Sequence, residues 1–156
     1  MFKTVVWATD GSANANHAFA LAFRLAQESG CPLVAVHSKE LMMGRAGGFP
    51  LLADEDEIEA RIAKQVGDAN QAGVDARVVI TGGSAGHAAH SIAEVAEKND
   101  ADLIVVGTRG HTPVAGLFLG SVAQRLLHVA HCPVLAVPPA DHAEDAVAAR
   151  ATAAVN

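Results

Sequence analysis

Short apolar runs alternate with longer Ala-rich segments along most of the chain. Each run has four to six mostly apolar residues, which is too short for an independent helix and typical of a parallel strand buried on both faces. The pattern therefore predicts five strands, at Thr4–Thr9, Leu33–His37, Ala76–Thr81, Leu103–Gly107 and Val134–Val137.

The segments between these runs carry apolar residues at helical spacing. They predict four helices, at Ala13–Ser29, about Ala53–Gln71, about Ser84–Lys98, and from Gly120-Ser121 to about Ala130. Gly30 and Gly73 stand where the first two helices should end, because glycine readily adopts the left-handed conformation that closes a helix. The acidic run at residues 54–57 suits the positive end of a helix dipole, which we favour over a metal site.

Strands joined by helices of this length must run parallel, and right-handed crossovers place the helices on both faces of the sheet. The chain is therefore expected to form a three-layer α/β/α fold, a Rossmann-like open twisted parallel sheet of five strands. Ligands of such sheets bind beyond the carboxyl ends of the strands, near the point where the strand order reverses. We therefore expect chemistry at residues 9–12, 37–40, 81–83 and 107–121.

The chain is expected to hold one domain over residues 1–138, followed by an Ala-rich tail at 139–156 that is a frayed helix or disordered. Residues 41–52 are apolar and Gly-containing, and they form either a flap over a pocket or a surface insertion. With 156 residues, 51% of them hydrophobic, the chain can bury a core without disulfides or metals. Cys31 and Cys132 each precede a proline and indicate neither a disulfide framework nor a zinc site.

Charge and hydropathy narrow the possible partners. Eleven Lys and Arg against seventeen Asp and Glu give a formal charge of -6 without a basic cluster, so no nucleic acid is expected as a partner. The sequence contains no run of eighteen apolar residues and no signal-peptide pattern at its start. We therefore expect a cytoplasmic protein with no membrane partner.

Glycines mark the segment from the fourth strand to the last helix. Gly107 ends the strand, Gly110 follows after two residues, and Gly120-Ser121 follows after nine more and opens the helix. Such glycines let backbone N–H groups approach an anion, and Ser121 can cap the helix and offer its hydroxyl to a phosphate. Any one of these glycines alone is better explained as a turn, but their joint spacing predicts a phosphate cradle.

This spacing, Gly-x2-Gly-x9-Gly-Ser, resembles the mark of the ATP-binding branch of the universal stress protein family. The resemblance covers about Phe2–Pro138, and it extends to the segments VVWATDGS, DLIVVGTRG, LGSVAQRLL and HCPVLAV. It implies the adenine nucleotide alpha hydrolase-like version of the fold, with strand order 3-2-1-4-5. It also implies ATP as the ligand, with Mg2+ or Mn2+ held beside the nucleotide.

The resemblance implies a role for each matching position. Asp10 would lie beside the ribose and phosphates and help to hold the metal, although an Asp in Asp-Gly-Ser is by itself better read as a turn residue. The remaining implied contacts are the site floor (Ala8, Thr9), the adenine end of the second strand (Val36, His37, Ser38), and the ribose and phosphate contacts (Gly107, Gly110, Gly120, Ser121, Val122).

Several positions leave alternatives open. Ser38 and Lys39 depart from the apolar residues that the family usually has there, which leaves the adenine contact unassigned. Arg109 either binds phosphate or faces solvent, and for His111 we favour exposure. Histidines and an acid spaced by three and four could form a metal site, but an ordinary polar helix face is favoured; these residues are His87, His90 and Glu94.

Three functions remain: an ATP-binding stress-response regulator, which we favour, a slow ATPase or autophosphorylating enzyme, and an interaction module without nucleotide. Fast phosphoryl transfer is not expected, because the loop offers Arg109, Ser121 and Asp10 but no lysine. Walker and Asp-x-Asp phosphatase motifs are absent, and Trp7 within the first strand is expected in the core rather than against a flavin. The apolar last strand, HCPVLAV, is expected at a sheet edge, and the resemblance implies a homodimer through it.

Overall fold

A computed structural model of the chain describes residues 1–41, 55–84, 86–109 and 119–139. The described elements are β1 (Val5–Thr9), α1 (Ala13–Ser29), β2 (Leu33–Leu41), α2 (Glu55–Gln71), β3 (Ala76–Ser84), α3 (Ala88–Lys98), β4 (Leu103–Gly107), α4 (Ser121–Val129) and β5 (Val134–Val137). All nine predicted elements are present. Gly30 and Gly73 close their helices with positive φ angles of 64° and 87°, as predicted.

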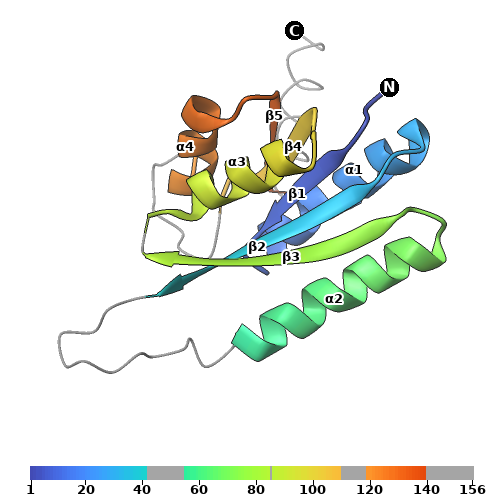
Figure 1. Cartoon of the computed structure of the whole chain (residues 1–156). Coiled ribbons are helices and arrows are strands. Elements are labelled where there is room, and N and C mark those ends of the chain that lie inside the picture. Colours follow the sequence, from blue (N-terminus) through green and yellow to red (C-terminus); the bar gives the residue numbers. More distant parts are fainter. Residues whose placement is uncertain (42–54, 85, 110–118, 140–156) are drawn as a thin grey trace, which may run out of the picture.

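The strands form one parallel sheet in the order β3-β2-β1-β4-β5, which confirms the expected topology (Figure 1). In the centre, Val5–Thr9 pairs with Leu33–His37 on one side, and Val5–Ala8 pairs with Leu103–Val106 on the other. β3 and β5 are the two edges. The strand order reverses at β1, so the carboxyl ends of β1, β2 and β4 meet where ligands of such sheets bind.

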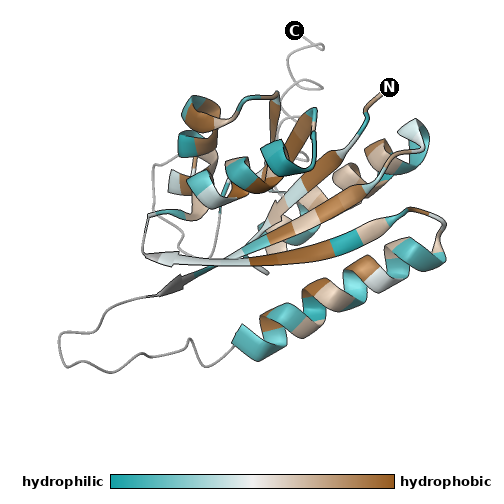
Figure 2. Cartoon of the chain, in the orientation of Figure 1, coloured by the Kyte–Doolittle hydropathy of each residue, from teal (hydrophilic) through white to brown (hydrophobic). Residues whose placement is uncertain are grey.

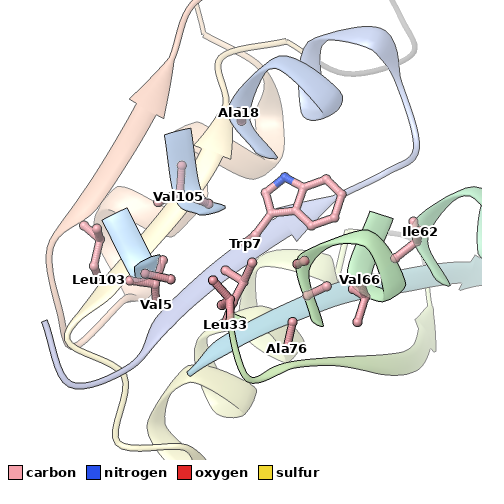
Figure 3. Close-up of a cluster of buried hydrophobic side chains, with 14 of the residues drawn as sticks. Val5, Trp7, Ala18, Leu33, Ile62, Val66, Ala76, Leu103 and Val105 are labelled. Carbon is pink, nitrogen blue, oxygen red and sulfur yellow. The ribbon is translucent and has the colours of Figure 1, made fainter. Parts of the chain in front are cut away.

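The sheet separates two apolar clusters. One packs β1 against α1 and α2 through residues that include Val5, Trp7, Ala18 and Ile62 (Figure 3). The indole N–H of Trp7 donates to the carbonyl of Ala15 at 3.0 Å, which satisfies the only polar atom of a fully buried ring. Trp7 is therefore a core residue, as predicted.

The second cluster lies on the other face, under α3 and α4, and consists mainly of Val, Ala, Ile and Leu. Each strand contributes alternate residues to the two clusters, since successive side chains point to opposite faces. Hydropathy follows the layers: the strands are mostly hydrophobic, and hydrophilic residues line the outer surfaces of the helices (Figure 2).

Three predicted boundaries were wrong. β2 and β3 continue beyond His37 and Thr81 and pair as far as Leu41 with Ser84. Consequently α3 begins at Ala88 rather than at Ser84. The hydrogen-bonded pairing with β2 carries β3 through Gly82 and Gly83, where the apolar pattern has stopped, and the turn into the helix comes at Gly86, which has a φ of 86°.

The structure also bears on membrane-spanning helices, on the two cysteines, and on the segments at 41–52 and 139–156. No helix of the described segments is long and apolar enough to cross a membrane. Both cysteines are free thiols, and burial raises the pKa of each. Most of segment 41–52, and residues 140–156 of the tail, lie outside the described residues.

Candidate functional site

The turn from β1 into α1 is built from three side chains that accept backbone hydrogens. The Thr9 hydroxyl accepts the Gly11 N–H at 3.1 Å, and the Asp10 carboxylate accepts the Ser12 N–H at 2.9 Å. Ser12 caps α1 by accepting the Ala15 N–H at 3.2 Å. This arrangement places the half-buried Asp10 carboxylate at the carboxyl end of β1 and confirms that it acts as a turn residue.

Gly11 is required in this turn for two reasons. Its φ is 76°, a conformation that residues with a Cβ rarely adopt. A Cβ at this position would also lie only 2.7 Å from Cγ2 of Ile58 in α2. Gly11 therefore lets α2 pack directly against the β1–α1 turn.

Gly107 at the end of β4 is fixed by backbone contacts. A Cβ there would lie 3.2 Å from the carbonyl oxygens of Asn14 and Arg109. The glycine thus lets the first turn of α1 approach β4 closely, on the face of the sheet that α1 covers. A side chain at this position would push apart the two segments that border the site.

The connection from β4 to α4 is closed at its base. The Gly120 N–H donates to the Thr108 carbonyl at 2.6 Å, and the Thr108 N–H donates to Val137 at 2.9 Å. The first hydrogen bond brings Gly120 close to Gly107 at the carboxyl end of β4, although the two glycines are thirteen residues apart in sequence. Gly110 and His111 lie within this connection but outside the described residues.

The start of α4 differs in one detail from the prediction. Gly120 occupies the N-cap position and makes no side-chain cap, so Ser121 is the first helical residue and does not cap the helix. Ser121 is exposed, and Val122 is half-buried against the second cluster. The backbone N–H groups of this first turn have no partner within the helix, which is the usual basis of anion binding at a helix start.

Arg109 is half-buried and lies two residues beyond the end of β4. Its Nε atom is buried and has no hydrogen-bond partner among the described residues. An arginine nitrogen in that position can donate to an acceptor that joins the site. The phosphate contact of Arg109 stays a prediction.

A buried polar pair occupies the end of β2. Nδ1 of His37 lies 2.9 Å from the Thr9 carbonyl oxygen, and Nε2 lies 2.6 Å from Oε1 of Glu55, the first residue of α2. A carbonyl can only accept, so Nδ1 carries a hydrogen; the second contact then requires another proton between the ring and the carboxylate. Both side chains are buried, and the pair ties β1, β2 and α2 together.

Sequence reasoning missed the role of Glu55, which it treated as part of an acidic first turn. The alternation along β2 held a signal, because Leu33, Ala35 and His37 share the face that α2 covers. The His37 side chain is therefore engaged inside the protein. Lys39 follows on the same face and forms an ion pair with Glu59 of α2, a hydrogen bond that raises the pKa of Lys39.

Ser38 points to the opposite face of β2, where α3 and α4 lie. It stands beside Thr81 in the β2–β3 register, and both residues are half-buried. The Thr81 hydroxyl oxygen is buried and has no partner in the described part of the chain. Two hydroxyl groups thus lie side by side at the carboxyl end of the sheet.

Most of the predicted site residues lie together at the carboxyl ends of the strands. Ala8 and Val36 are buried in the second cluster, so only their backbone can face a ligand. The others at this edge are Thr9, Asp10, His37, Ser38, Gly107, Arg109, Gly120, Ser121 and Val122.

The described residues contain no group of three His, Cys, Asp or Glu side chains that could hold a metal ion. His87 and His90 lie with ring centroids 6.2 Å apart, but together with Glu94 they do not form such a group. This finding supports the polar-face interpretation of α3. Asp10 is likewise not part of a protein-only metal cluster.

Comparison with known proteins supports the resemblance seen in the sequence. The model of the universal stress protein family matches residues 1–138. A Thermus aquaticus protein named "universal stress protein in QAH/OAS sulfhydrylase 3' region" is 36% identical over 144 residues, covering 88% of this chain and 99% of that protein.

Two solved structures are similar as well. A universal stress protein in complex with cAMP has a TM-score of 0.62 at 28% identity, over 87% of this chain and 96% of that one. The universal stress protein from Archaeoglobus fulgidus in complex with dAMP has a TM-score of 0.60 at 27% identity, over 88% and 98% of the two chains. With its parallel sheet and the matched residues 1–138, the chain belongs to the universal stress protein family.

Proposed function

We propose that the protein binds ATP at the carboxyl edge of β1, β2 and β4 and acts as a nucleotide-dependent regulator. The observation that carries the proposal is the closed β4–α4 connection, in which Gly120 bonds Thr108 and leaves Ser121 exposed at the helix start. Structures of related universal stress proteins with cAMP and dAMP support an adenine nucleotide as the ligand. Stress-response regulation and a cytoplasmic location stay predictions.

The phosphates would bind the first turn of α4. Free N–H groups at Ser121 and Val122 and the Ser121 hydroxyl supply donors, and the Nε atom of Arg109 supplies another. With a net charge of -6, the protein must attract a polyanion through such local donors rather than through a basic surface.

The adenine would lie at the end of β2 near Ser38 and Thr81. Their side-by-side hydroxyl groups can donate to or accept from the edge of a base, and the unpartnered Thr81 oxygen fits that role. His37 would support the site indirectly. Its buried contacts with Thr9 and Glu55 hold the end of β1 in place beside the site.

A divalent ion fits the site only together with the nucleotide. The Asp10 carboxylate lies at the strand end and uses one oxygen for the Ser12 N–H. Mg2+ and Mn2+ accept carboxylate and phosphate oxygens, and Mg2+ commonly uses one or two carboxylates plus substrate phosphates. When bound, the ion would neutralise phosphate charge, while Asp10 would hold it against the β1–α1 turn.

We expect slow turnover at most. Efficient phosphoryl transfer relies on cationic clamps, and Lys39, which lies near the carboxyl end of β2, is paired with Glu59 on the α2 side. ATP hydrolysis or autophosphorylation at ordinary kinase rates, abolished by Asp10→Ala, would favour the enzyme alternative. Binding without turnover favours a regulator.

Dimerisation through β5 is part of the proposal. β5 is an edge strand, and Leu135 within it is 36% exposed. An apolar strand with unpaired backbone groups readily pairs with another chain. Analytical ultracentrifugation at micromolar concentration should show a homodimer, and Leu135→Lys should shift it toward monomer; a wild-type monomer would contradict this part.

Isothermal titration with ATP, AMP and cAMP tests the proposed function. Ser121→Glu places a negative charge at the start of α4, which favours the helix but repels phosphate. We expect it to abolish ATP binding without lowering the melting temperature. Ala20→Glu, at an exposed position of α1, is the matched control and should bind like wild type. Absence of binding for all three nucleotides in the wild-type protein, with and without Mg2+, would instead support the nucleotide-free interaction module.

A further inference from the structure

A groove of about 500 Å3 separates the first turn of α3 from α4. It begins at Ser121, which we propose binds phosphate, and continues along one face of α4 to Arg125 and His128. Gly86 and His90 form the facing wall. The groove is therefore continuous with the proposed phosphate site, and it extends to residues that the glycine motif does not include.

Arg125 provides positive charge along this groove. Arg125 is exposed, and its Nη1 atom donates to the Gly86 carbonyl at 3.2 Å, which holds the guanidinium across the groove. No carboxylate lines the groove within the described residues, and Arg125 forms no ion pair with any of them. The guanidinium has five N–H donors, so most remain available to an acceptor.

Two imidazoles add further hydrogen-bonding groups to the groove. His90 on α3 and His128 on α4 are both exposed and both line the groove. The nearest acid along α3, Glu94, faces Lys98 at 3.7 Å instead. In a protein with net charge -6, a groove lined by an arginine and two histidines without an opposing acid is a local exception.

We propose that this groove receives the outer phosphoryl groups of the bound nucleotide, so that Arg125 selects nucleoside polyphosphates over monophosphates. The inference rests on the proposed function. Arg125 follows Ser121 by one helical turn, roughly 6 Å along the axis. A monophosphate seated at Ser121 leaves that gap open, whereas the further phosphoryl groups of ATP extend across it. Arginine binds such oxygens with a planar pair of N–H donors.

The test compares ATP and AMP binding by isothermal titration at constant Mg2+ and salt. Arg125→Gln should weaken ATP binding roughly tenfold, because a charge-assisted contact is lost, and should change AMP binding less than about twofold. Arg24→Gln is the control: Arg24 is an exposed arginine on α1, paired with Glu28 on its own helix, and its loss should change neither affinity. Arg125→Lys keeps the charge but not the paired donors and should fall between wild type and Arg125→Gln.

Each outcome has a distinct meaning. If wild-type protein binds neither nucleotide, the proposed function fails and this inference fails with it. If both nucleotides bind but Arg125→Gln weakens them equally, or weakens neither, the proposed function stands and the groove does not select polyphosphates. A drop confined to ATP, with an unchanged melting temperature, supports the inference. The double variant His90→Gln/His128→Gln should then reduce ATP binding in the same selective way, and an unchanged ATP affinity would restrict the selection to Arg125.

Discussion

The two halves of the carboxyl edge of the sheet are built differently. At the β1–β2 half, the buried His37 side chain is satisfied within the protein, by the Thr9 backbone carbonyl and the Glu55 carboxylate. At the β4–α4 half, glycine backbone, an exposed serine and the exposed Arg125 lie near this edge. One half therefore holds the fold together, while the other leaves donors available to a ligand.

One side of the sheet can combine stability with binding because its two halves satisfy their polar groups differently. Buried polar groups are costly unless they are paired, so the His37–Glu55 pair is stable only as a complete unit. The β4–α4 half places its donors at a helix start, where they need no partner from within the protein because water satisfies them. Substitutions that break the buried His37–Glu55 pair should therefore lower stability, whereas substitutions of the exposed donors at the start of α4 should lower nucleotide affinity.

The largest effect is expected from Glu55→Ala. It leaves the buried His37 without the partner of its Nε2 atom, and breaking a buried pair in this way costs about 3 kcal/mol of unfolding free energy. Chemical denaturation measures the change. Glu57→Ala, an exposed acid in the same helical turn, should cost well under 1 kcal/mol. Equal losses for the two variants would show that the first half is not held by this pair.

A smaller loss is expected for Gly107→Ala. The added Cβ meets backbone oxygens at 3.2 Å, which cannot rotate away, so we expect a cost of about 2 kcal/mol. Gly67→Ala on α2 is the matched control, because a Cβ at Gly67 would meet nothing within 4 Å. This substitution should stabilise the protein by about 0.5–1 kcal/mol, since alanine favours a helix more than glycine does. If thermal melts show the same change for both, close packing of α1 on β4 does not require the glycine.

The smallest effect concerns the reactivity of the two thiols, which lie just before β2 and β5, at the amino ends of these strands. Burial, together with the charge of Asp102, raises the pKa of Cys31 before β2 and of Cys132 before β5. Less thiolate is then present near neutral pH, so labelling should be slower than for free cysteine and should accelerate as pH rises. The buried Cys31 should react more slowly than the half-buried Cys132. Mass spectrometry of single-cysteine variants measures both labelling rates. Faster labelling of Cys31 than of Cys132 would contradict the burial of the two thiols described above.

The sequence was sufficient where local pattern and long-range packing agree. The five apolar runs predicted the strands, and helical spacing together with Gly30 placed both ends of α1 correctly. It failed where pairing decides: β3 continues through Gly82 and Gly83 because β2 supplies hydrogen bonds, not because those residues favour a strand.

The candidate site shows the same division. The glycine motif predicted the place where β4 and α4 meet, because close backbone approach requires glycine. The pairing of Glu55 with His37 was not predictable from spacing, since the two residues meet only through the packing of α2 on the sheet. The groove at Arg125 also depends on two helices that are far apart in sequence.

Nucleotide binding at the start of α4 can be tested by an amide chemical-shift titration of 15N-labelled protein with MgATP. If phosphates bind the start of α4, the largest shifts should fall on the N–H groups of Ser121 and Val122, with smaller ones at Gly107 and Thr108. The amide shifts of Gly30 and Gly73, near the amino ends of β2 and β3, should remain unchanged. Shifts centred at the amino ends of the strands, or no shifts at saturating ATP, would contradict the proposed site.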